Sequence, residues 1–271
     1  MKKVIFILLD GLTLNGAKEN MGYLSHLVEK NIASFTEIKG ELPSLSRPCY
    51  QTILTGQPAY KHGITANNIN KISNLNSIFS LVRENNLKTA AAAYYWISEL
   101  YNESPFNPVK SRITHSELLP IQYGLFYFDD AYPDSHLFLD GEFLRQRFNP
   151  DFTFIHPMGL DYIGHKFGSD SSEYENALIN MDSIIANLLP TWISEDYVIF
   201  ITSDHGMTEK GSHGGDKDIL RKLPLYGINI KFEKSLYSQL QIAPTLCEVL
   251  GIAIPETMEN KAINFSLKNK N

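Results

Sequence analysis

Residues 203–214 read Ser-Asp-His-Gly-Met-Thr-Glu-Lys-Gly-Ser-His-Gly, and residues 197–202 before them read Tyr-Val-Ile-Phe-Ile-Thr. The uninterrupted apolar run predicts a strand that is buried on both faces of a sheet. The polar segment therefore lies at the carboxyl end of a strand, where open α/β sheets bind ligands. Asp204, His205 and His213 offer one oxygen and two nitrogen ligands of the kind that zinc prefers. A polar turn with a solvated histidine is the alternative, unless other segments bring ligands to the same edge.

The start of the chain has the same organisation. Residues 4–9 read Val-Ile-Phe-Ile-Leu-Leu, which predicts another buried strand, and Asp10-Gly11 follows directly. This places the Asp10 carboxylate at the carboxyl end of a strand. Because Asp before Gly is also common in plain turns, the position alone leaves both interpretations open.

A third strand pattern, residues 152–155, also ends in polar residues. Asp161 and His165 stand four residues apart, so in a helical turn both would face one side and could hold one ion. Ordinary surface pairs use the same spacing. His156, just past the strand, is interpreted as a structural histidine.

The segment from Glu41 to Gly56 has the composition of a complete helix with its ends. Ser46 suits the N-cap, Pro48 the first turn and Gly56 the end. Capping alone explains a serine at this place. Alternatively, its hydroxyl lies beside free backbone N–H groups and the positive end of the helix dipole, where a phosphoryl group would be held, and Arg47 would add a cation.

Strand and helix patterns alternate along most of the chain, which predicts an α/β fold. The alternation breaks near residues 96–149, where Tyr, Phe and Pro are frequent, and this part is predicted to be a cap or insertion over the sheet edge. Residues 171–189 predict a long amphipathic helix ending at Pro190. The polar residues 260–271 predict a frayed end. Residues 1–265 are predicted to form a single domain with this internal cap.

Composition excludes several classes of protein. The chain of 271 residues has a formal net charge of -6 and no basic run, which argues against nucleic-acid polymers and anionic membranes as partners. Its two cysteines favour a reducing compartment. The first apolar run stops after six residues, too short for a signal peptide, and no stretch approaches a membrane span. We therefore expect a cytoplasmic protein, and the pattern leaves its oligomeric state open.

Taken together, these segments resemble the alkaline phosphatase superfamily and, within it, the nucleotide pyrophosphatase/phosphodiesterase branch. The resemblance covers nearly the whole chain and implies a three-layer α/β fold with a mostly parallel central sheet and a small aromatic-rich cap. The motifs that carry it occur in the family's order: Asp10-Gly11, Pro-Ser-x-Ser-x-Pro ending at Pro48, Thr55-Gly56, His62-Gly63-Ile64 with Asn67, Asp161-x-x-Gly-His165, Ser203-Asp204-His205-Gly206, and the closing Ile-Ala-Pro-Thr-Leu helix.

The resemblance also implies a site with two divalent metal ions, Zn²⁺ or alternatively Mn²⁺. Ser46 would be the nucleophile, and Asn67, with the backbone amide of the nucleophile, would contact a phosphoryl oxygen. The ligands fall into two sets. The first ligand group holds one ion and comprises Asp10, Ser46, Asp204 and His205, and the second ligand group holds the other and comprises Asp161, His165 and His213.

The implied activity is hydrolysis of a small phosphate ester, of the phosphodiesterase or pyrophosphatase type, through a phosphoseryl intermediate on Ser46. A phosphomonoesterase, a phosphoethanolamine-type transferase and a phosphonate hydrolase are the alternatives. An inactive binding module would require a broken ligand set, and all the expected ligands are present.

Two features depart from the branch. The nucleophile is usually threonine followed by an aromatic residue and Pro-Asn, whereas this chain has Ser46-Arg47-Pro48-Cys49. His213 lies only eight residues after His205, as in the ethanolamine phosphate transferases of lipid-anchor synthesis.

Overall fold

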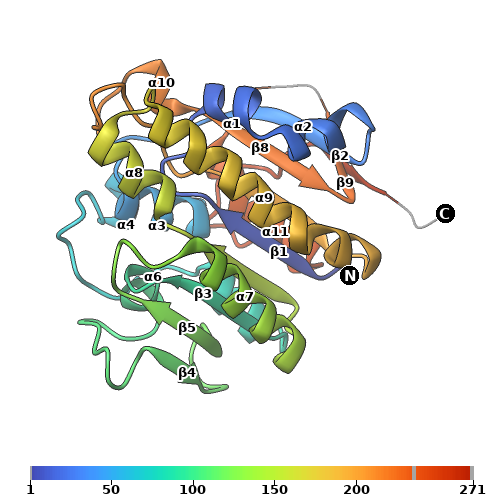
Figure 1. Ribbon diagram of the computed structural model, residues 1–271. Helices are drawn as coiled ribbons and strands as arrows, with labels where there is room; N and C mark the ends of the chain where they lie inside the picture. Colours follow the sequence, from blue (N-terminus) through green and yellow to red (C-terminus); the bar gives the residue numbers. More distant parts are fainter. Residues whose placement is uncertain (1, 234–235, 269–271) are drawn as a thin grey trace.

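A sheet with the strand order β10-β2-β8-β7-β1-β6-β3-β5-β4 runs through the centre of the molecule (Figure 1), in a computed structural model that describes residues 2–233 and 236–268. Buried β-branched and aromatic residues dominate its central strands. The strands are β1 (Val4–Leu8), β2 (Ala33–Lys39), β3 (Thr89–Tyr94), β4 (Ile113–His115), β5 (Tyr123–Tyr127), β6 (Phe152–His156), β7 (Val198–Thr202), β8 (Lys222–Ile228) and β10 (Tyr237–Ser238).

The middle of this sheet is parallel, as predicted. Strand β1 pairs in parallel with β6 on one side and with β7 on the other, where Leu8 lies opposite Thr202. Strand β8 runs antiparallel to both β7 and β2, and β4 runs antiparallel to β5. The carboxyl ends of β1, β6 and β7 therefore meet at one edge.

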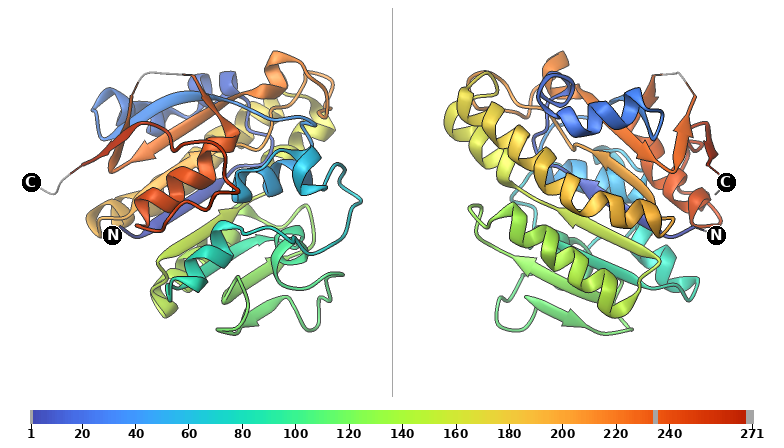
Figure 2. Two further views of the ribbon diagram at one scale, coloured as in Figure 1. Left: turned by 180° about the vertical axis from the view of Figure 1, so that it is seen from behind. Right: turned by 45° about the vertical axis from the view of Figure 1, so that its right-hand side comes forward.

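Helices cover both faces of the sheet and make three layers (Figures 1 and 2). Neighbouring residues of β1 point to opposite faces, so that Phe6 joins one core and Ile7 the other. The helices packed against the Ile7 face are α1 (Leu14–Asn20), α2 (Gly22–Glu29), α7 (Asp134–Phe148) and α9 (Ser172–Ser194), and those against the Phe6 face are α3 (Ser46–Thr55), α5 (Ile78–Glu84), α6 (Trp96–Tyr101) and α11 (Ile242–Val249).

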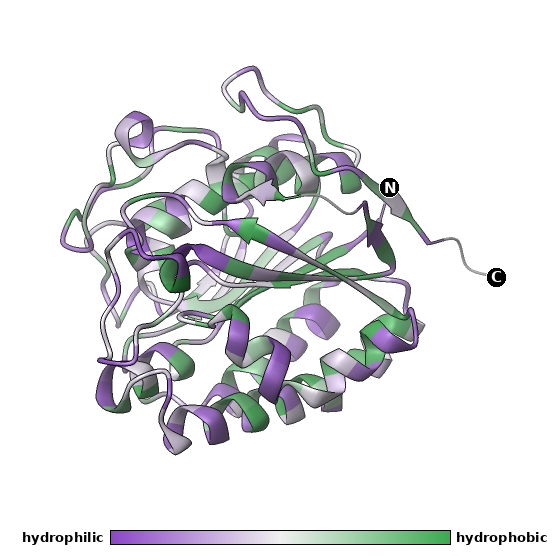
Figure 3. Ribbon diagram, turned by 90° about the horizontal axis from the view of Figure 1, so that it is seen from above, coloured by the Kyte–Doolittle hydropathy of each residue, from purple (hydrophilic) through white to green (hydrophobic). Residues whose placement is uncertain are grey.

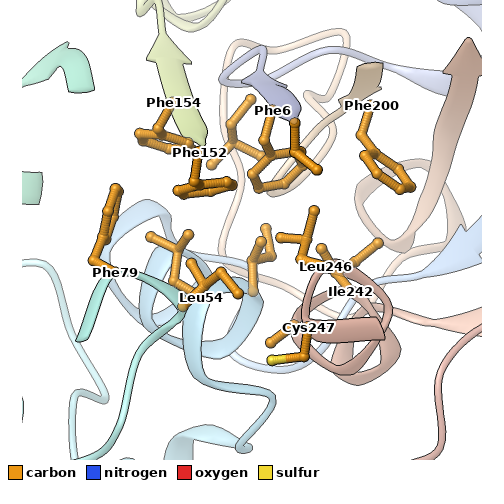
Figure 4. Packing of buried hydrophobic residues seen from close by; sticks show 14 of the residues in the cluster. Phe6, Leu54, Phe79, Phe152, Phe154, Phe200, Ile242, Leu246 and Cys247 are labelled. Atoms are coloured by element: carbon orange, nitrogen blue, oxygen red, sulfur yellow. The ribbon is translucent and has the colours of Figure 1, made fainter. Parts of the chain in front are cut away.

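Side chains of the sheet and helices interlock in the core on the Phe6 face. Figure 4 shows Phe6, Phe152 and Phe200 facing Leu54 of α3 and Leu246 of α11. Seen from above, the outer helices alternate apolar and polar residues, as expected for helices with one buried face (Figure 3). This packing fixes α3 against the sheet.

Short elements gather near the carboxyl ends of the central strands, on the left of Figure 1. They include α4 (Ala59–His62), α8 (Gly159–Phe167) and α10 (Asp218–Arg221), while the single turn η1 (Gln239–Gln241) precedes α11. No helix within residues 2–233 and 236–268 is long and apolar enough to cross a membrane.

The prediction of a cap near residues 96–149 needs correction. Strands β5 and β4 continue the central sheet beyond β3, and α7 packs on β3 and β6. The aromatic residues that broke the sequence pattern are therefore mostly packing residues of the sheet and its covering helix; for example, Tyr123 stacks on Phe148 with ring centroids 4.0 Å apart.

Two helix and strand ends also differ from the prediction. Helix α9 continues through Pro190 to Ser194. Proline removes one backbone hydrogen bond, but burial of the Leu189 and Trp192 side chains on the inner face of the helix stabilises it by more than this loss. Phe265–Leu267 forms β11, paired antiparallel with β9 (Ile230–Phe232), so this part of the polar end is ordered. Residues 269–271 of the predicted frayed end lie outside the described residues.

Candidate metal and phosphoryl site

The sheet brings the first ligand group together. Asp10 lies two residues beyond Leu8, and Asp204 lies two residues beyond Thr202, the residue opposite Leu8 on β7. His205 Nε2 lies 3.2 Å from Asp204 Oδ2 and 3.4 Å from Asp10 Oδ1. All three of these side chains are buried. The structure therefore brings these three predicted residues together, and they form a set that could hold a cation.

Ser46 joins this group from helix α3. Its Oγ lies 3.1 Å from His205 Nε2. The sequence predicted Ser46 as the N-cap, but the N-cap is Leu45, and Ser46 is the first residue of the helix. The correction has a physical reason: the hydroxyl contacts His205 instead of a backbone N–H of its own helix. Ser46 therefore lies at the positive end of the helix dipole with its oxygen facing the ligands.

The second ligand group lies beside the first. Asp161 and His165 are on one face of α8, as their spacing predicted, with His165 Nε2 3.4 Å from Asp161 Oδ2. His213 reaches the same place from the loop after β7, and its Nε2 lies 3.7 Å from Asp161 Oδ1 and 3.1 Å from His165 Nε2. Of these side chains, His165 is the most exposed, at 45%.

Backbone carbonyls orient the three imidazoles in the same way. The Nδ1 atoms of His165, His205 and His213 lie 2.9, 3.0 and 2.9 Å from backbone carbonyl oxygens, which can only accept a hydrogen bond. Each Nδ1 therefore carries the proton, and each Nε2 presents a lone pair to the site. Such contacts fix the tautomer of metal-binding histidines. The Nε2 atoms of His165 and His213 are both acceptors, so their lone pairs repel each other at 3.1 Å. A cation bound to both nitrogens would turn this repulsion into attraction.

The carboxylates show the complementary pattern. Asp204 Oδ1 accepts a hydrogen bond from the Gly11 amide at 3.3 Å, and Asp10 Oδ2 accepts one from the Tyr50 hydroxyl. The other oxygens, Asp10 Oδ1 and Asp204 Oδ2, are buried without a hydrogen-bond partner among the described residues, as is Asp161 Oδ1. Buried unsatisfied oxygens are costly, and one divalent cation beside Asp10 and Asp204 with a second beside Asp161 would satisfy all three. The residues present therefore fit two metal ions.

The pKa values of these groups follow from burial. Burial, with the nearby Asp204 carboxylate, raises the pKa of Asp10 to about 7. Burial, with the Asp10 carboxylate, raises the pKa of Asp161 to about 7, and burial raises the pKa of Asp204 well above its usual range. Burial lowers the pKa of His213 to about 3, so this imidazole is neutral and able to bind a metal at pH 7. Without a cation, burial therefore favours the protonated forms of Asp10, Asp161 and Asp204. A bound cation would favour their charged forms.

His213 lies between the two ligand groups. Its ring stacks on that of His205 with centroids 3.7 Å apart. Asp161, His205 and His213 also have ligand atoms within 4.8 Å of one another. The assignment of His213 to the second ion, rather than to the ion of His205, stays a prediction.

Asn67 and Arg47 lie at the N-terminus of α3. Asn67 Oδ1 accepts a hydrogen bond from the Arg47 backbone amide at 3.1 Å, which holds Asn67 beside Ser46. The Arg47 guanidinium is buried, 4.5 Å from the Trp96 ring centroid and 2.7 Å from Glu99 Oε2. Its charge is thus already paired inside the protein. The predicted contact between Arg47 and a phosphoryl group stays a prediction.

The sequence patterns did not single out Tyr50 or Glu99. Tyr50 contacts Asp10 from helix α3, and Glu99 pairs with Arg47 from α6. A signal for Tyr50 was available, since it stands one helical turn after Ser46 and shares its face of the helix. No local pattern marks Glu99, because its partner lies 52 positions away.

Solved structures share this fold. Murine ectonucleotide pyrophosphatase/phosphodiesterase 5 superposes with a TM-score of 0.74 over 94% of this chain and 96% of that one, at 12% identity. A phosphonate monoester hydrolase from Silicibacter pomeroyi gives a TM-score of 0.63 over 97% and 76%, at 14% identity. Both likenesses show that the chain has the same fold as these proteins.

The sequence comparison is more specific. Residues 4–222 match the model of the family "Type I phosphodiesterase / nucleotide pyrophosphatase", and the chain belongs to that family. The human GPI ethanolamine phosphate transferase 2 catalytic subunit is 27% identical over 274 residues, covering 94% of this chain. The human GPI ethanolamine phosphate transferase 3 catalytic subunit is 34% identical over 113 residues, 39% of this chain. This chain spans only 27% and 10% of the lengths of those two proteins.

Proposed function

We propose that this chain is a two-metal enzyme that cleaves phosphodiester or pyrophosphate bonds through a phosphoseryl intermediate on Ser46. One observation carries the proposal: unpaired carboxylate oxygens and imidazole Nε2 lone pairs converge beside a serine hydroxyl at a helix N-terminus. The family to which the chain belongs supports it. Imidazole and carboxylate donors suit zinc, and manganese is the alternative.

Two divalent ions in this site would stabilise negative charge on oxygen and lower the pKa of a bound hydroxyl. In the first step, Ser46 Oγ bonds to phosphorus, and the leaving-group oxygen departs with a proton as an alcohol or phosphate. In the second step, water replaces Ser46 on phosphorus and the serine regains its proton. The N-terminus of α3 and the Asn67 side chain favour the negative phosphoryl oxygens in both steps.

A transferase is the second candidate, and the relatives favour it. The two human relatives described above are both named ethanolamine phosphate transferases. The first step would be unchanged, and an acceptor alcohol would replace water in the second. The phosphoryl group carried on Ser46 would then bear ethanolamine.

The experiment compares hydrolysis of bis(p-nitrophenyl) phosphate and p-nitrophenyl phosphate by protein loaded with zinc or manganese. We expect the diester to be hydrolysed faster and Ser46→Ala to abolish turnover while the ions stay bound. Monoester turnover faster by orders of magnitude would instead identify a phosphomonoesterase. Full activity of the Ser46→Ala variant would remove the nucleophile assignment.

The two candidates are separated by adding an acceptor. With a phosphoethanolamine diester as donor and a simple sugar alcohol as acceptor, a transferase forms the phosphoethanolamine ester of the acceptor. A hydrolase forms only free phosphoethanolamine.

A further inference from the structure

We propose that Tyr50, whose hydroxyl holds one oxygen of Asp10, and His156, which lies beside the same oxygen, are positioning residues that direct the other oxygen of Asp10 toward the ion beside Ser46. The inference rests on the proposed function, because it concerns the metal site described above. Both residues lie outside the two ligand groups. Their common contact is Asp10 Oδ2.

Tyr50 supplies the direct contact. Its hydroxyl donates to Asp10 Oδ2 and also lies 3.4 Å from Met158 Sδ. Since Tyr50 is on α3 four residues after Ser46, the same helical face presents the nucleophile and this donor to the first ligand group. The side chain is fully buried, so water does not compete for the contact.

His156 approaches the same oxygen from the end of β6. Its Nε2 lies 3.4 Å from Asp10 Oδ2, and neither ring nitrogen has a hydrogen-bond partner among the described residues. The ring lies parallel to Phe154 and meets Tyr50 edge-on, with centroids 5.9 and 4.6 Å apart. These two aromatic contacts keep the imidazole directed at Asp10. A small shift of the carboxylate would complete a second hydrogen bond.

Tyr50 and His156 lie on the Oδ2 side of Asp10, whereas Asp10 Oδ1 has no hydrogen-bond partner among the described residues and lies 3.4 Å from His205 Nε2. A carboxylate held at one oxygen can offer only the other, in a fixed direction, to an ion. Loss of such an outer contact typically costs about 10–100-fold in metal affinity. We expect the effect mainly on the ion of the first ligand group, because no hydrogen bond among the described residues joins Tyr50 or His156 to Asp161, His165 or His213.

The test measures metal affinity directly. The full chain is stripped of metal and titrated with Co²⁺ in competition with a chelator, and the visible spectrum follows each site. We expect two bound ions for the unchanged protein. In Tyr50→Phe, one ion should bind about 10–100-fold more weakly while the other keeps its affinity and spectrum. Activity of Tyr50→Phe should recover at high metal concentration, which a residue needed only for folding or chemistry would not show.

Matched variants complete the design. Tyr226→Phe also removes a buried hydroxyl, one that donates to the Ala17 carbonyl, and should leave both affinities unchanged. His156→Phe should weaken the same ion as Tyr50→Phe, whereas His156→Gln, which keeps a donor, should weaken it less. Unchanged affinities in both Tyr50→Phe and His156→Phe would overturn the inference. If the unchanged protein bound no ion, the proposed function would fail instead.

Discussion

The carboxylates of Asp10, Asp161 and Asp204 are enclosed by protein and lie close to one another. In water each would be ionised at neutral pH, but burial and mutual repulsion favour the protonated forms. A divalent cation reverses this balance, because it attracts the charged form of each carboxylate. Metal binding and proton release are therefore coupled in this site.

The coupling predicts a pH dependence of metal affinity. Because the pKa of Asp10 and that of Asp161 are raised to about 7, binding of ions to the two ligand groups at pH 6 must displace protons from these two carboxyl groups. The apparent affinity of each group should therefore fall as the pH drops below 7. Titration calorimetry at pH 6 in two buffers of different ionisation enthalpy counts the released protons. Equal enthalpies in the two buffers would contradict the prediction.

At the scale of elements, the loop after β7 and helix α8 depend on each other. Gly211 has a φ of +69°, and its carbonyl oxygen lies 2.9 Å from His165 Nδ1. A Cβ at this position would lie 2.7 Å from the His165 carbonyl oxygen and 2.8 Å from that of Gly164. The loop can approach α8 this closely only with glycine at this position.

Gly211→Ala should therefore weaken the second ion selectively. The added methyl group pushes the loop from α8, which removes the contact that orients His165. We expect loss of one bound ion by elemental analysis and a large drop in turnover, with the far-ultraviolet circular dichroism unchanged. Gly22→Ala is the matched control, since a Cβ there meets no atom within 4 Å. Retention of both ions in Gly211→Ala would refute this role of the loop.

The Arg47–Glu99 pair joins helices α3 and α6. Glu99 also accepts a hydrogen bond from the Phe106 amide at 2.9 Å, so it links α3 to the segment after α6. Both charged side chains are almost completely buried. Removing one partner leaves an uncompensated buried charge.

Glu99→Ala should destabilise the protein by about 3–5 kcal/mol, whereas the double variant Arg47→Met, Glu99→Met should lose much less. Denaturant unfolding of the single and double variants measures the difference. Turnover of the double variant then tests the catalytic role proposed for Arg47. Normal turnover would show that Arg47 serves only to anchor α3, and a loss of turnover with both ions bound would support a contact with the phosphoryl group.

For the whole molecule, the two ligand groups connect segments from residue 10 to residue 213. Ions that bind only the folded chain stabilise it, by about 2.7 kcal/mol per site at a free concentration 100-fold above Kd. Removing the ions with a chelator should therefore lower Tm by about 5 °C per site. Scanning calorimetry with and without chelator checks this, with Gly22→Ala as a control variant that should respond like the unchanged protein. An unchanged Tm after verified metal removal would contradict it.

Much of this molecule could be predicted from its sequence. The buried strands ending at Leu8 and Thr202 and the spacing of Asp161 and His165 are local patterns, and local patterns report strand ends and helix faces. The segment near residues 96–149 was misjudged because β5 joins the sheet through β3, where Ala90 lies opposite Tyr123, and β4 is a short edge strand paired only with β5 among the described residues. The predicted helix end at Pro190 was wrong for a similar reason, since burial of Leu189 and Trp192 in the tertiary structure stabilises α9 by more than the lost backbone hydrogen bond destabilises it.

The site was predicted less completely than the fold. Motif order indicated the ligand residues, but contacts such as Tyr50 to Asp10 and Arg47 to Glu99 join positions 40 and 52 residues apart. Such pairs have no signature in a single sequence. They appear only once the strands and helices are placed.

The register of β1 against β7 has a consequence for the choice of ion. Neighbouring strands lie about 4.8 Å apart, and Asp10 and Asp204 each follow the last paired residues, Leu8 and Thr202, by two positions, so the paired strands limit how far these carboxylates can separate. Paired strands do not limit the second ligand group in this way, because Asp161 and His165 lie on α8 and His213 lies on a loop. The His165 side chain is also half exposed. The first position should thus reject ions as large as Ca²⁺ and exchange slowly, while the second should accept a wider range and exchange quickly. Competition titrations with Ca²⁺ and Mn²⁺ would distinguish a rigid position from an adaptable one within the same enzyme.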